Sequence, residues 1–373
     1  MVIHLSITKR KCAQGVSAVL DNIETQLVPL GGHKVFRARS MESREAIVEG
    51  TPNFRLVSLI KKINVVYVIY MLFSALSIVK NNLASVEKGS IVVCHDIFCL
   101  IWVAMLGSPG IERKVCLYNH SDGHPIDTLI DKHDSMLVRF LCNLIEKRLA
   151  KLRLNSIYSL SLAATNKIKA RFKYSRDMRF VEVRNFAAIA KHRPKISIRE
   201  PRVWIIGTVC ERKGQLELFE RLSQLGHVIP DIHVAGPATK EDIKQMGNYS
   251  FVKYLGILAD VSSEMISKDI CLSVSSNEGL PMALIEAASA GAVIISTDVG
   301  GCSDICHDNV NGYLLPYPYS DKDLLGRILE LKSSDDLVLR FSDSSKDLFE
   351  SFFSVGCAVR FWKSEILLIS SKL

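Results

Sequence analysis

The chain has 373 residues, of which 48% are apolar and 23% are charged, so it is long and apolar enough for two globular domains and is not a disordered chain. The net charge of +8 is unevenly spread, because residues 1–199 hold 31 Lys and Arg against 15 Asp and Glu, and the remainder hold 16 against 24. A basic half indicates an anionic partner. We expect a membrane surface rather than nucleic acid, since no nucleic-acid motif with interleaved aromatic residues is present.

The first half alternates strand and helix patterns, which predicts a doubly wound α/β sheet. Residues 2–7 form the first expected strand, and apolar residues recur at helical spacing over residues 16–30 before Gly31 and Gly32 end the helix. Further strands are expected at residues 33–38, 90–94, 114–120, 156–161 and 179–185, with a helix at residues 136–149.

Residues 63–79 form an uncharged apolar segment of 17 residues. This length is at the lower limit for a membrane span, and the segment also contains Asn64, Ser74 and Ser77, so we favour a core or interfacial helix over a span. Residues 97–106 are apolar but too short to span. Two apolar helices in a basic half are typical of a protein that lies on a membrane surface.

The second half begins after a basic, proline-containing stretch at residues 187–201, which is the best candidate for a linker. Strands are expected at residues 203–208, 232–236 and 251–255, with a helix from Gly214. No repeats or low-complexity tracts interrupt this series.

The most informative segment joins a strand at residues 270–274 to a helix through a loop that contains Glu278. Pro281 suits the first helical position, and Gly291 suits the helix end before a strand at residues 292–296. Glu286 then lies about one and a half turns into the helix. In open α/β sheets, ligands bind at the carboxyl ends of strands, and helix starts attract phosphate. The segment therefore predicts a site for a ligand with both phosphates and hydroxyls.

A second loop, residues 207–214, also joins a strand to a helix and contains Arg212 and Lys213. A lysine in this position can reach phosphate oxygens at the helix start. The alternative is a solvated pair of basic residues at a helix end.

These motifs resemble the signature of the group 1 retaining glycosyltransferases, which have the two-domain GT-B fold. The resemblance is strong over residues 203–316 and moderate over the first half. It rests on Glu278-Gly279-Leu280-Pro281 followed by Glu286, on Thr297-Asp298-Val299-Gly300-Gly301, and on Asn311-Gly312-Tyr313-Leu314-Leu315.

The resemblance implies an α/β fold of two Rossmann-like doubly wound domains that face each other across a donor-binding cleft. Residues 1–190 would form an acceptor-binding, membrane-facing domain, and residues 200–350 a nucleotide-sugar-binding domain. Residues 351–373 would form a helix that packs back on the first domain.

By motif position, Glu278 would contact the donor sugar, Glu286 the ribose and Lys213 the diphosphate. Many family members have arginine directly after the first glycine of the 207–214 loop, where this chain has Thr208, so Arg212 is the candidate for the second cation. The residues expected to bind substrate are Gly15, Arg212, Lys213, Asn277, Gly279, Leu280, Pro281, Met282 and Glu286.

In the first half, Gly15 lies where the family has a glycine-containing loop near the diphosphate and the acceptor, although it reads equally well as a turn residue. His120 follows a strand at a position where the family often has a histidine facing the donor sugar. We expect His120 and Glu278 to be the catalytic residues. His95 ends the preceding strand and reads equally well as a structural histidine.

Several other chemistries are disfavoured. Cys302 and Cys306 lack a matching pair for zinc, and the loop between His120 and His124 does not present both histidines from one helix, so we expect no metal. Asp321 and Asp323 precede an expected helix and read as capping residues. No hydrolase elbow is present, and the loop after the first strand has a single glycine, which disfavours a nicotinamide enzyme.

We therefore expect a retaining, metal-independent hexosyltransferase without a cofactor. It would move a sugar from a nucleotide-diphosphate donor to a hydroxyl of a glycan or lipid-linked acceptor, in the synthesis of lipopolysaccharide, O-antigen or capsule. The alternatives are a nucleotide-sugar epimerase on the same fold and a non-catalytic membrane scaffold. Ten scattered cysteines and the lack of a secretory signal indicate a cytoplasmic protein, which we place on the inner face of the membrane.

Overall fold

The computed structural model describes residues 1–8, 15–37, 64–83, 86–87, 89–106, 114–121, 126–127, 130, 135–149, 154–171, 178–189, 200–258 and 260–371. The chain divides into two compact units, each built around a six-stranded parallel sheet. The first unit comprises Met1–Cys12, Ile23–Val183 and Phe361–Leu373, and the second comprises Ala13–Asn22 and Arg184–Arg360.

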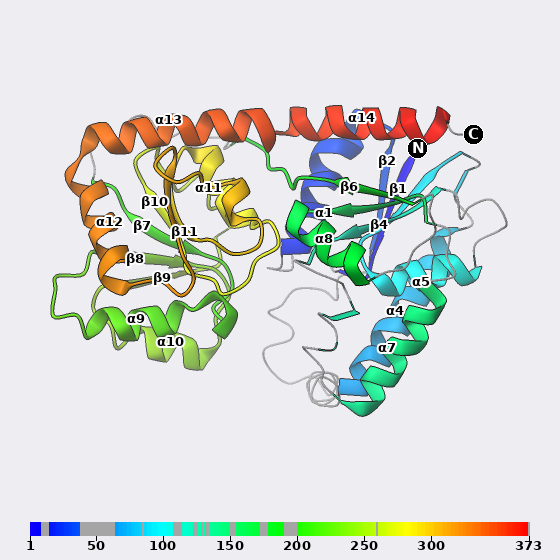
Figure 1. Ribbon diagram of the computed structural model, residues 1–373, viewed down its shortest axis with the longest axis horizontal. Helices are drawn as coiled ribbons and strands as arrows, with labels where there is room; N and C mark the ends of the chain where they lie inside the picture. The colour runs from blue at the N-terminus through cyan, green and yellow to red at the C-terminus, as the bar shows by residue number, and fades with distance from the viewer. Residues whose placement is uncertain are drawn as a thin grey trace. The chain divides into compact units, whose positions relative to one another are not determined.

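The sheet of the first unit has the strand order β2-β1-β3-β4-β5-β6 (Figure 1). The four inner strands are short and buried along their whole length, as expected for parallel strands that are covered on both faces, whereas the edge strands β2 and β6 are partly exposed. They are β1 (Val2–Ser6), β2 (His33–Arg37), β3 (Ile91–Cys94), β4 (Val115–Asn119), β5 (Ser156–Ser159) and β6 (Arg179–Glu182).

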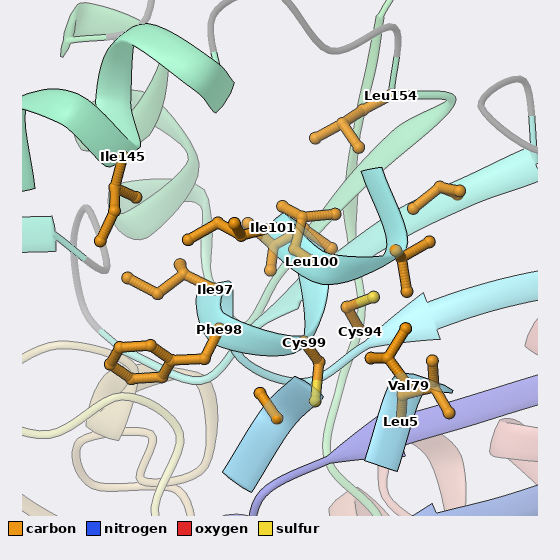
Figure 2. Close-up of a cluster of buried hydrophobic side chains, with 14 of the residues drawn as sticks. Leu5, Val79, Cys94, Ile97, Phe98, Cys99, Leu100, Ile101, Ile145 and Leu154 are labelled. Carbon is orange, nitrogen blue, oxygen red and sulfur yellow. The ribbon is translucent and has the colours of Figure 1, made fainter. Parts of the chain in front are cut away.

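The helices of the first unit cover a continuous apolar core. Figure 2 shows part of this core, where Phe98 and Leu100 of α5 lie among side chains of the strands and of neighbouring helices. A π-helical turn (Ile23–Leu27) and a 3-10 turn (Val28–Leu30) precede β2. The longer helices are α4 (Asn64–Leu83), α5 (Ile97–Leu106), α7 (Met136–Leu149) and α8 (Leu162–Arg171).

The helix α4 packs against α5 and α7 and is buried on one side only. Val68 and Val79 are fully buried, whereas Phe73 is 65% exposed. The expected core or interfacial helix at residues 63–79 is thus a helix of 20 residues, and residue 63 lies outside the described residues. Neither α4 nor any other helix in the described part of the chain has the combined length and apolarity that a membrane crossing requires.

A buried carboxylate ties the end of the chain to the sheet of the first unit. Glu365 belongs to α14 (Val355–Ser371), and its Oε2 accepts a hydrogen bond of 2.9 Å from the hydroxyl of Tyr158 in β5. Its Oε1 accepts a hydrogen bond of 2.8 Å from Nη2 of Arg179 in β6. Glu365 is only 6% exposed, so these two partners replace the water that its charge would otherwise need.

The sheet of the second unit has the order β12-β11-β10-β7-β8-β9. The chain starts at a central strand, builds outward on one side, and then returns to build on the other side. The strands are β7 (Val203–Ile206), β8 (Ile232–Ala235), β9 (Val252–Gly256), β10 (Ile270–Ser273), β11 (Val293–Thr297) and β12 (Gly312–Leu315).

Helices α9 and α10 lie on one face of this sheet, and α11 and α13 lie on the other (Figure 1). The helix α1 packs against α11, although α1 precedes it by more than 250 residues. The helices are α1 (Gly15–Asn22), α9 (Gln215–Ser223), α10 (Lys240–Met246), α11 (Met282–Ala290), α12 (Asp321–Ser333) and α13 (Asp335–Phe352), with 3-10 turns at Glu211–Lys213 and Cys302–Asp304.

The boundary between the two units lies before the linker expected at residues 187–201. Arg184 lies over the ring of Phe352 at 4.5 Å, and the N–H of Ala187 donates to the carbonyl oxygen of Phe353 at 3.0 Å. These contacts place residues 184–187 in the second unit, so the boundary falls at Val183. Residues 190–199 of the expected linker lie outside the described residues.

Apart from α4, most expected elements appear within one or two residues of their predicted ends, with four differences in detail. The strand expected at residues 179–185 ends at Glu182. The expected helix at residues 16–30 is an α-helix to Asn22 followed by the π-helical and 3-10 turns. The final helix, expected over residues 351–373, begins at Val355, because α13 extends to Phe352. The cap of α12 is Ser320, whose hydroxyl accepts from the N–H of Asp323, so the aspartates occupy the first turn and do not cap it.

The replacement Glu365→Ala should lower the free energy of unfolding by about 2–4 kcal/mol, because it leaves Arg179 and Tyr158 without their acceptor. Urea unfolding followed by circular dichroism measures this loss. Glu330→Ala is the matched control, since its ion pair with Arg327 is about half exposed, and it should cost under ~1 kcal/mol. Equal losses in the two variants would contradict this account.

Candidate functional site

The candidate site lies where the strand order of the second sheet reverses. The strands β7 and β10 are neighbours and parallel, so the loops that follow them meet at one edge of the sheet. Ligands of open α/β sheets bind at this kind of position. The first loop contains Arg212 and Lys213, and the second contains Glu278.

The loop after β7 is fixed from within by Gln215, the first residue of α9. Gln215 is fully buried, and its Nε2 donates to the carbonyl oxygen of Thr208 at 3.1 Å. Its Oε1 accepts from the N–H of Cys210 at 3.3 Å. Gly214 has φ +67°, and a Cβ there would lie 3.1 Å from the carbonyl oxygen of Val274. This left-handed residue therefore lets the two loops approach each other closely.

The loop after β10 is held against the first loop and against β11. The N–H of Ser276 donates to the carbonyl oxygen of Arg212 at 2.9 Å. The hydroxyl of Thr297 donates to the carbonyl oxygen of Ser275 at 2.7 Å. Both loops are therefore fixed by backbone contacts, and the side chains that they carry are held at defined positions.

Glu278 lies at the centre of this arrangement and is only 7% exposed. Its Oε1 is 2.6 Å from Nζ of Lys213 and 3.1 Å from Nη1 of Arg212. The same oxygen accepts a hydrogen bond of 2.7 Å from the hydroxyl of Ser275. Burial by itself would raise the pKa of Glu278, but the two cations and these hydrogen bonds outweigh it and hold the pKa below its usual value. The carboxylate is therefore ionised at neutral pH.

The backbone of Glu278 is approached closely by the loop after β11. Gly300 has φ +56°, and a Cβ there would lie 1.6 Å from the carbonyl oxygen of Glu278. The N–H of Gly301 donates to the carbonyl oxygen of Gly279 at 2.7 Å. Any side chain at Gly300 would displace the Glu278 loop, so the glycine pair fixes how deep the carboxylate lies.

The helix α11 begins directly after this loop. Pro281 has φ −71° and ψ 115°, so it is the cap of the helix, and the expectation that it would be the first helical residue is wrong by one position. Its carbonyl oxygen accepts from the N–H groups of Leu284 and Ile285. The N–H groups of Met282 and Ala283 precede these bonds and have no acceptor within the helix, which makes them donors for an anion.

Glu286 presents a carboxylate from the second turn of α11. Burial and, to a smaller extent, the negative charge of Asp260 raise the pKa of Glu286 to about 7. No ion pair or hydrogen bond to this carboxylate is found among the described residues. Glu278 and Glu286 thus have opposite environments: the first is balanced by two cations, and the second has only an acidic neighbour.

The first-unit candidates occupy different surroundings. His120 follows β4 and stacks on Tyr118 with ring centroids 4.4 Å apart. Its Nε2 forms a hydrogen bond of 2.8 Å with Nδ1 of His95, and the tautomer decides which of the two nitrogens donates. Burial lowers the pKa of His120 to about 3, so the ring is neutral. Gly15 is the first residue of α1, the helix that packs against α11, and it belongs to the second unit with Glu286.

The structure gathers some of the expected residues and adds others. Arg212 and Lys213 meet Glu278, and Arg212 also donates to the carbonyl oxygen of Asn277, whose side chain is exposed. Leu280, Pro281 and Met282 are buried, so they can offer a ligand backbone groups rather than side chains. Three residues that the sequence analysis missed fix the loops: Ser275, Gln215 and Asn185, whose Nδ2 donates to the carbonyl oxygen of Leu280 at 2.9 Å.

Serine, glutamine and asparagine are common in loops, so no sequence signal singled them out. Within the residues that the structure describes, no three His, Cys, Asp or Glu side chains form a group that could hold a metal ion. His124 lies outside those residues.

Comparisons with known proteins match the part of the chain that holds this site. The family model for glycosyl transferases group 1 matches residues 200–333. An N,N'-diacetylbacillosaminyl-diphospho-undecaprenol alpha-1,3-N-acetylgalactosaminyltransferase from Campylobacter jejuni is 26% identical over 149 residues, which span 39% of this chain and 39% of that relative's length.

Two solved structures show the fold over nearly the whole chain. A sucrose-phosphate synthase from Thermosynechococcus elongatus has a TM-score of 0.69 at 14% identity and covers 99% of both chains. The glycosyltransferase WaaG, described as involved in lipopolysaccharide biosynthesis, has a TM-score of 0.60 at 14% identity, covering 94% of this chain and 95% of its own. The expected α/β fold with two Rossmann-like units is confirmed.

The raised pKa of Glu286 predicts a pH-dependent stability. Because its pKa of about 7 in the folded state exceeds the ordinary value of 4.5, the folded protein binds the proton more tightly. The resulting stability is fully present below pH 4.5 and is lost as the pH rises through 7. Glu286→Gln should therefore be more stable than the wild type at pH 8, by roughly 1–3 kcal/mol, and should lose this advantage at pH 5.

Thermal unfolding of both proteins between pH 5 and pH 8 measures this difference. The replacement Glu241→Gln, at an exposed position on α10, is the control and should follow the wild type throughout. If the Glu286→Gln curve ran parallel to the wild-type curve, the assigned environment of Glu286 would be wrong.

Proposed function

We propose that the chain is a group 1 glycosyltransferase, the family whose model matches residues 200–333, and that it moves a sugar from a nucleotide-diphosphate donor to a hydroxyl of a glycan or lipid-linked acceptor. The observation that carries this proposal is the buried Glu278, held between Lys213 and Arg212 at the carboxyl edge of the second sheet. The site offers cations for a diphosphate and carboxylates for hydroxyls within two adjoining loops and the helix that follows the second loop.

We assign the donor diphosphate to Lys213, Arg212 and the start of α11. Both side chains already converge on one carboxylate oxygen, so an anionic ligand that enters the site meets cations that are in place. The N–H groups of Met282 and Ala283 and the dipole of α11 add favourable partial charge. Stabilisation of the leaving diphosphate by these groups is electrostatic and needs no metal ion.

Glu286 is the group that we assign to the ribose. Its carboxylate has no cationic partner in the described part of the chain, and an oxygen pair of this kind accepts hydrogen bonds from two neighbouring hydroxyls. A ribose would replace the water that burial has removed. Asn277 and Gly279 flank Glu278 in the loop, where a sugar–diphosphate group would pass, and α1 with Gly15 lies against α11, the helix of Glu286.

Glu278 and His120 are the groups that we assign to the donor sugar. The lowered pKa keeps Glu278 as an acceptor, and the neutral ring of His120 can donate or accept a single hydrogen bond. Transfer would retain the anomeric configuration through attack of the acceptor hydroxyl on the face that the diphosphate leaves, with the hydroxyl proton passing to the leaving phosphate. No carboxylate nucleophile is then required.

The acceptor is proposed to be part of cell-surface polysaccharide synthesis, such as lipopolysaccharide, O-antigen or capsule. The Campylobacter relative acts on a sugar–diphospho-undecaprenol, and WaaG is described in lipopolysaccharide biosynthesis. We place this protein on the cytoplasmic face of the inner membrane. In the first unit, exposed apolar side chains gather on three helices that pack together, α4, α5 and α7: Ile69, Tyr70, Phe73, Met105, Leu106, Met136, Leu137, Phe140 and Leu144.

Donor binding should be detectable by thermal stabilisation against a panel of nucleotide sugars in the presence of a chelator. One donor should raise the midpoint, and Lys213→Met should weaken its affinity about 10–100-fold, because a charge-assisted contact is lost. Glu286→Gln should weaken only the contribution that the nucleotide part of the donor makes to the affinity. Lys240→Met, at an exposed position on α10, is the matched control and should bind like the wild type. A wild-type protein that no nucleotide sugar stabilises would overturn the proposal.

Membrane association should depend on the apolar helices of the first unit. Phe73 and Phe140 are 65% and 57% exposed, and replacing both by serine should weaken sedimentation with anionic lipid vesicles by about tenfold or more. Val228→Ser, at an exposed apolar position in the second unit, should have no effect. Wild-type binding to vesicles by the double variant would show that this surface does not meet the lipid.

A further inference from the structure

Four histidines form a continuous row across four neighbouring strands of the first sheet. Nδ1 of His33, in β2, is 3.2 Å from Nε2 of His4, in β1. Nδ1 of His4 is 2.9 Å from Nε2 of His95, which follows β3. Nδ1 of His95 is 2.8 Å from Nε2 of His120, which follows β4. Each contact therefore joins the Nδ1 of one ring to the Nε2 of the next.

The row is buried and enclosed by aromatic rings. His4 is fully buried and His95 is 4% exposed. The ring of Trp362 meets His4 edge-on at 5.3 Å between centroids, and the ring of Tyr118 stacks on His95 at 4.9 Å. Burial lowers the pKa of every ring in the row, and neighbouring histidines add to the effect at His4 and His95, so all four rings are neutral at pH 7.

The geometry does not suit a metal ion. A zinc site needs three or four ligands that converge on one point at about 2.0–2.1 Å. Here the nitrogens face each other in pairs at hydrogen-bonding distance, and each inner ring uses both of its nitrogens for two different partners. Among the described residues, no group of three His, Cys, Asp or Glu side chains could hold a metal ion.

In such a row, the tautomer of each neutral ring determines the tautomer of its neighbours. A neutral imidazole has one N–H and one bare nitrogen, and each contact needs one of each. If Nε2 of His4 donates to His33, then Nδ1 of His4 must accept from Nε2 of His95, and Nδ1 of His95 must accept from Nε2 of His120. The only other arrangement reverses all three hydrogen bonds. The four rings therefore share one tautomer.

We infer that His95, His4 and His33 are positioning residues that hold His120 in a single tautomer, and so fix whether its remaining nitrogen, Nδ1, meets the donor sugar as an acceptor or as a donor. This rests on the proposed contact between His120 and the sugar. With Nε2–H throughout, Nδ1 of His120 accepts from a hydroxyl; with Nδ1–H throughout, it donates. If the three hydrogen bonds reverse from the Nε2–H form, Nδ1 of His120 takes up one proton and Nε2 of His33 releases one. The ring of His120 therefore cannot change its tautomer alone.

The first test needs no substrate. Long-range proton–nitrogen correlation spectra of the full-length protein, labelled with ¹⁵N-histidine, report the tautomer of each ring, and assignment uses single-histidine variants. We expect His4, His33, His95 and His120 to show one common, unmixed tautomer. The exposed His227 in the same spectrum is the internal control and should show the averaged signal of a solvated ring. Opposite tautomers within the row, or averaged signals from its inner rings, would overturn the inference.

The second test breaks the row two rings away from His120. His4→Phe keeps an aromatic ring against Trp362 but can neither donate nor accept. It should release the tautomer of His120 and reduce the rate of donor hydrolysis about three- to tenfold, the worth of one hydrogen bond, with KM unchanged. His4→Gln can both donate and accept, so it should restore the common tautomer and much of the rate. His233→Phe, a histidine replacement in β8 of the second unit, is the matched control.

The two tests separate the inference from the function on which it rests. If the wild type shows one tautomer but hydrolyses no nucleotide sugar, the row is real and the proposed function is wrong. If His4→Phe leaves both the tautomer of His120 and the rate unchanged, the row plays only a structural role and the inference is wrong. If His4→Phe fails to fold, the wild-type spectra and the Gln variant still decide it.

Discussion

The candidate site depends on the charge balance around one buried carboxylate. Glu278 is 7% exposed and stays ionised because Lys213 and Arg212 reach the same oxygen from the neighbouring loop. Neither the carboxylate of Glu278 nor the largely buried ammonium group of Lys213 could be buried alone at small cost. The glutamate therefore keeps in place the two cations that we propose for the diphosphate, and the cations keep the glutamate in its acceptor form.

This constraint explains why the surrounding loops are so closely fixed. Gln215 and Ser275 fix the two loops from within, and the N–H of Ser276 joins them through the carbonyl oxygen of Arg212. Gly300 lets the loop after β11 approach Glu278 closely. A donor diphosphate would compete with Glu278 for Lys213 and Arg212, and the freed carboxylate oxygen could then accept a hydroxyl of the sugar. The first unit differs, because its histidine row is neutral. There, hydrogen bonds rather than charges determine whether Nδ1 of His120 donates or accepts.

The sequence was sufficient for the elements and for the motif, because both depend on residues close together in the chain. The strand β10, Glu278 and Gly291 are within about 20 residues, and their spacing alone predicts a strand, loop and helix. Contacts between distant segments could not be predicted in this way. His4 and His95 are 91 residues apart, and Glu365 reaches Tyr158 across 207 residues, so only the folded sheet brings them together. The pairing of Lys213 with Glu278 required the reversal of strand order between β7 and β10, which spacing does not reveal.

The most direct test of the account compares Glu278→Gln with the wild type in two measurements: donor affinity by calorimetry and the rate of donor hydrolysis. The neutral amide keeps the shape of the side chain but no longer holds the cations. The account predicts that the variant binds the donor at least as tightly as the wild type, because Lys213 and Arg212 are released for the diphosphate. It also predicts that hydrolysis falls by about a hundredfold or more. A variant that hydrolyses the donor at the wild-type rate, or that no longer binds it, would contradict the role assigned to this carboxylate.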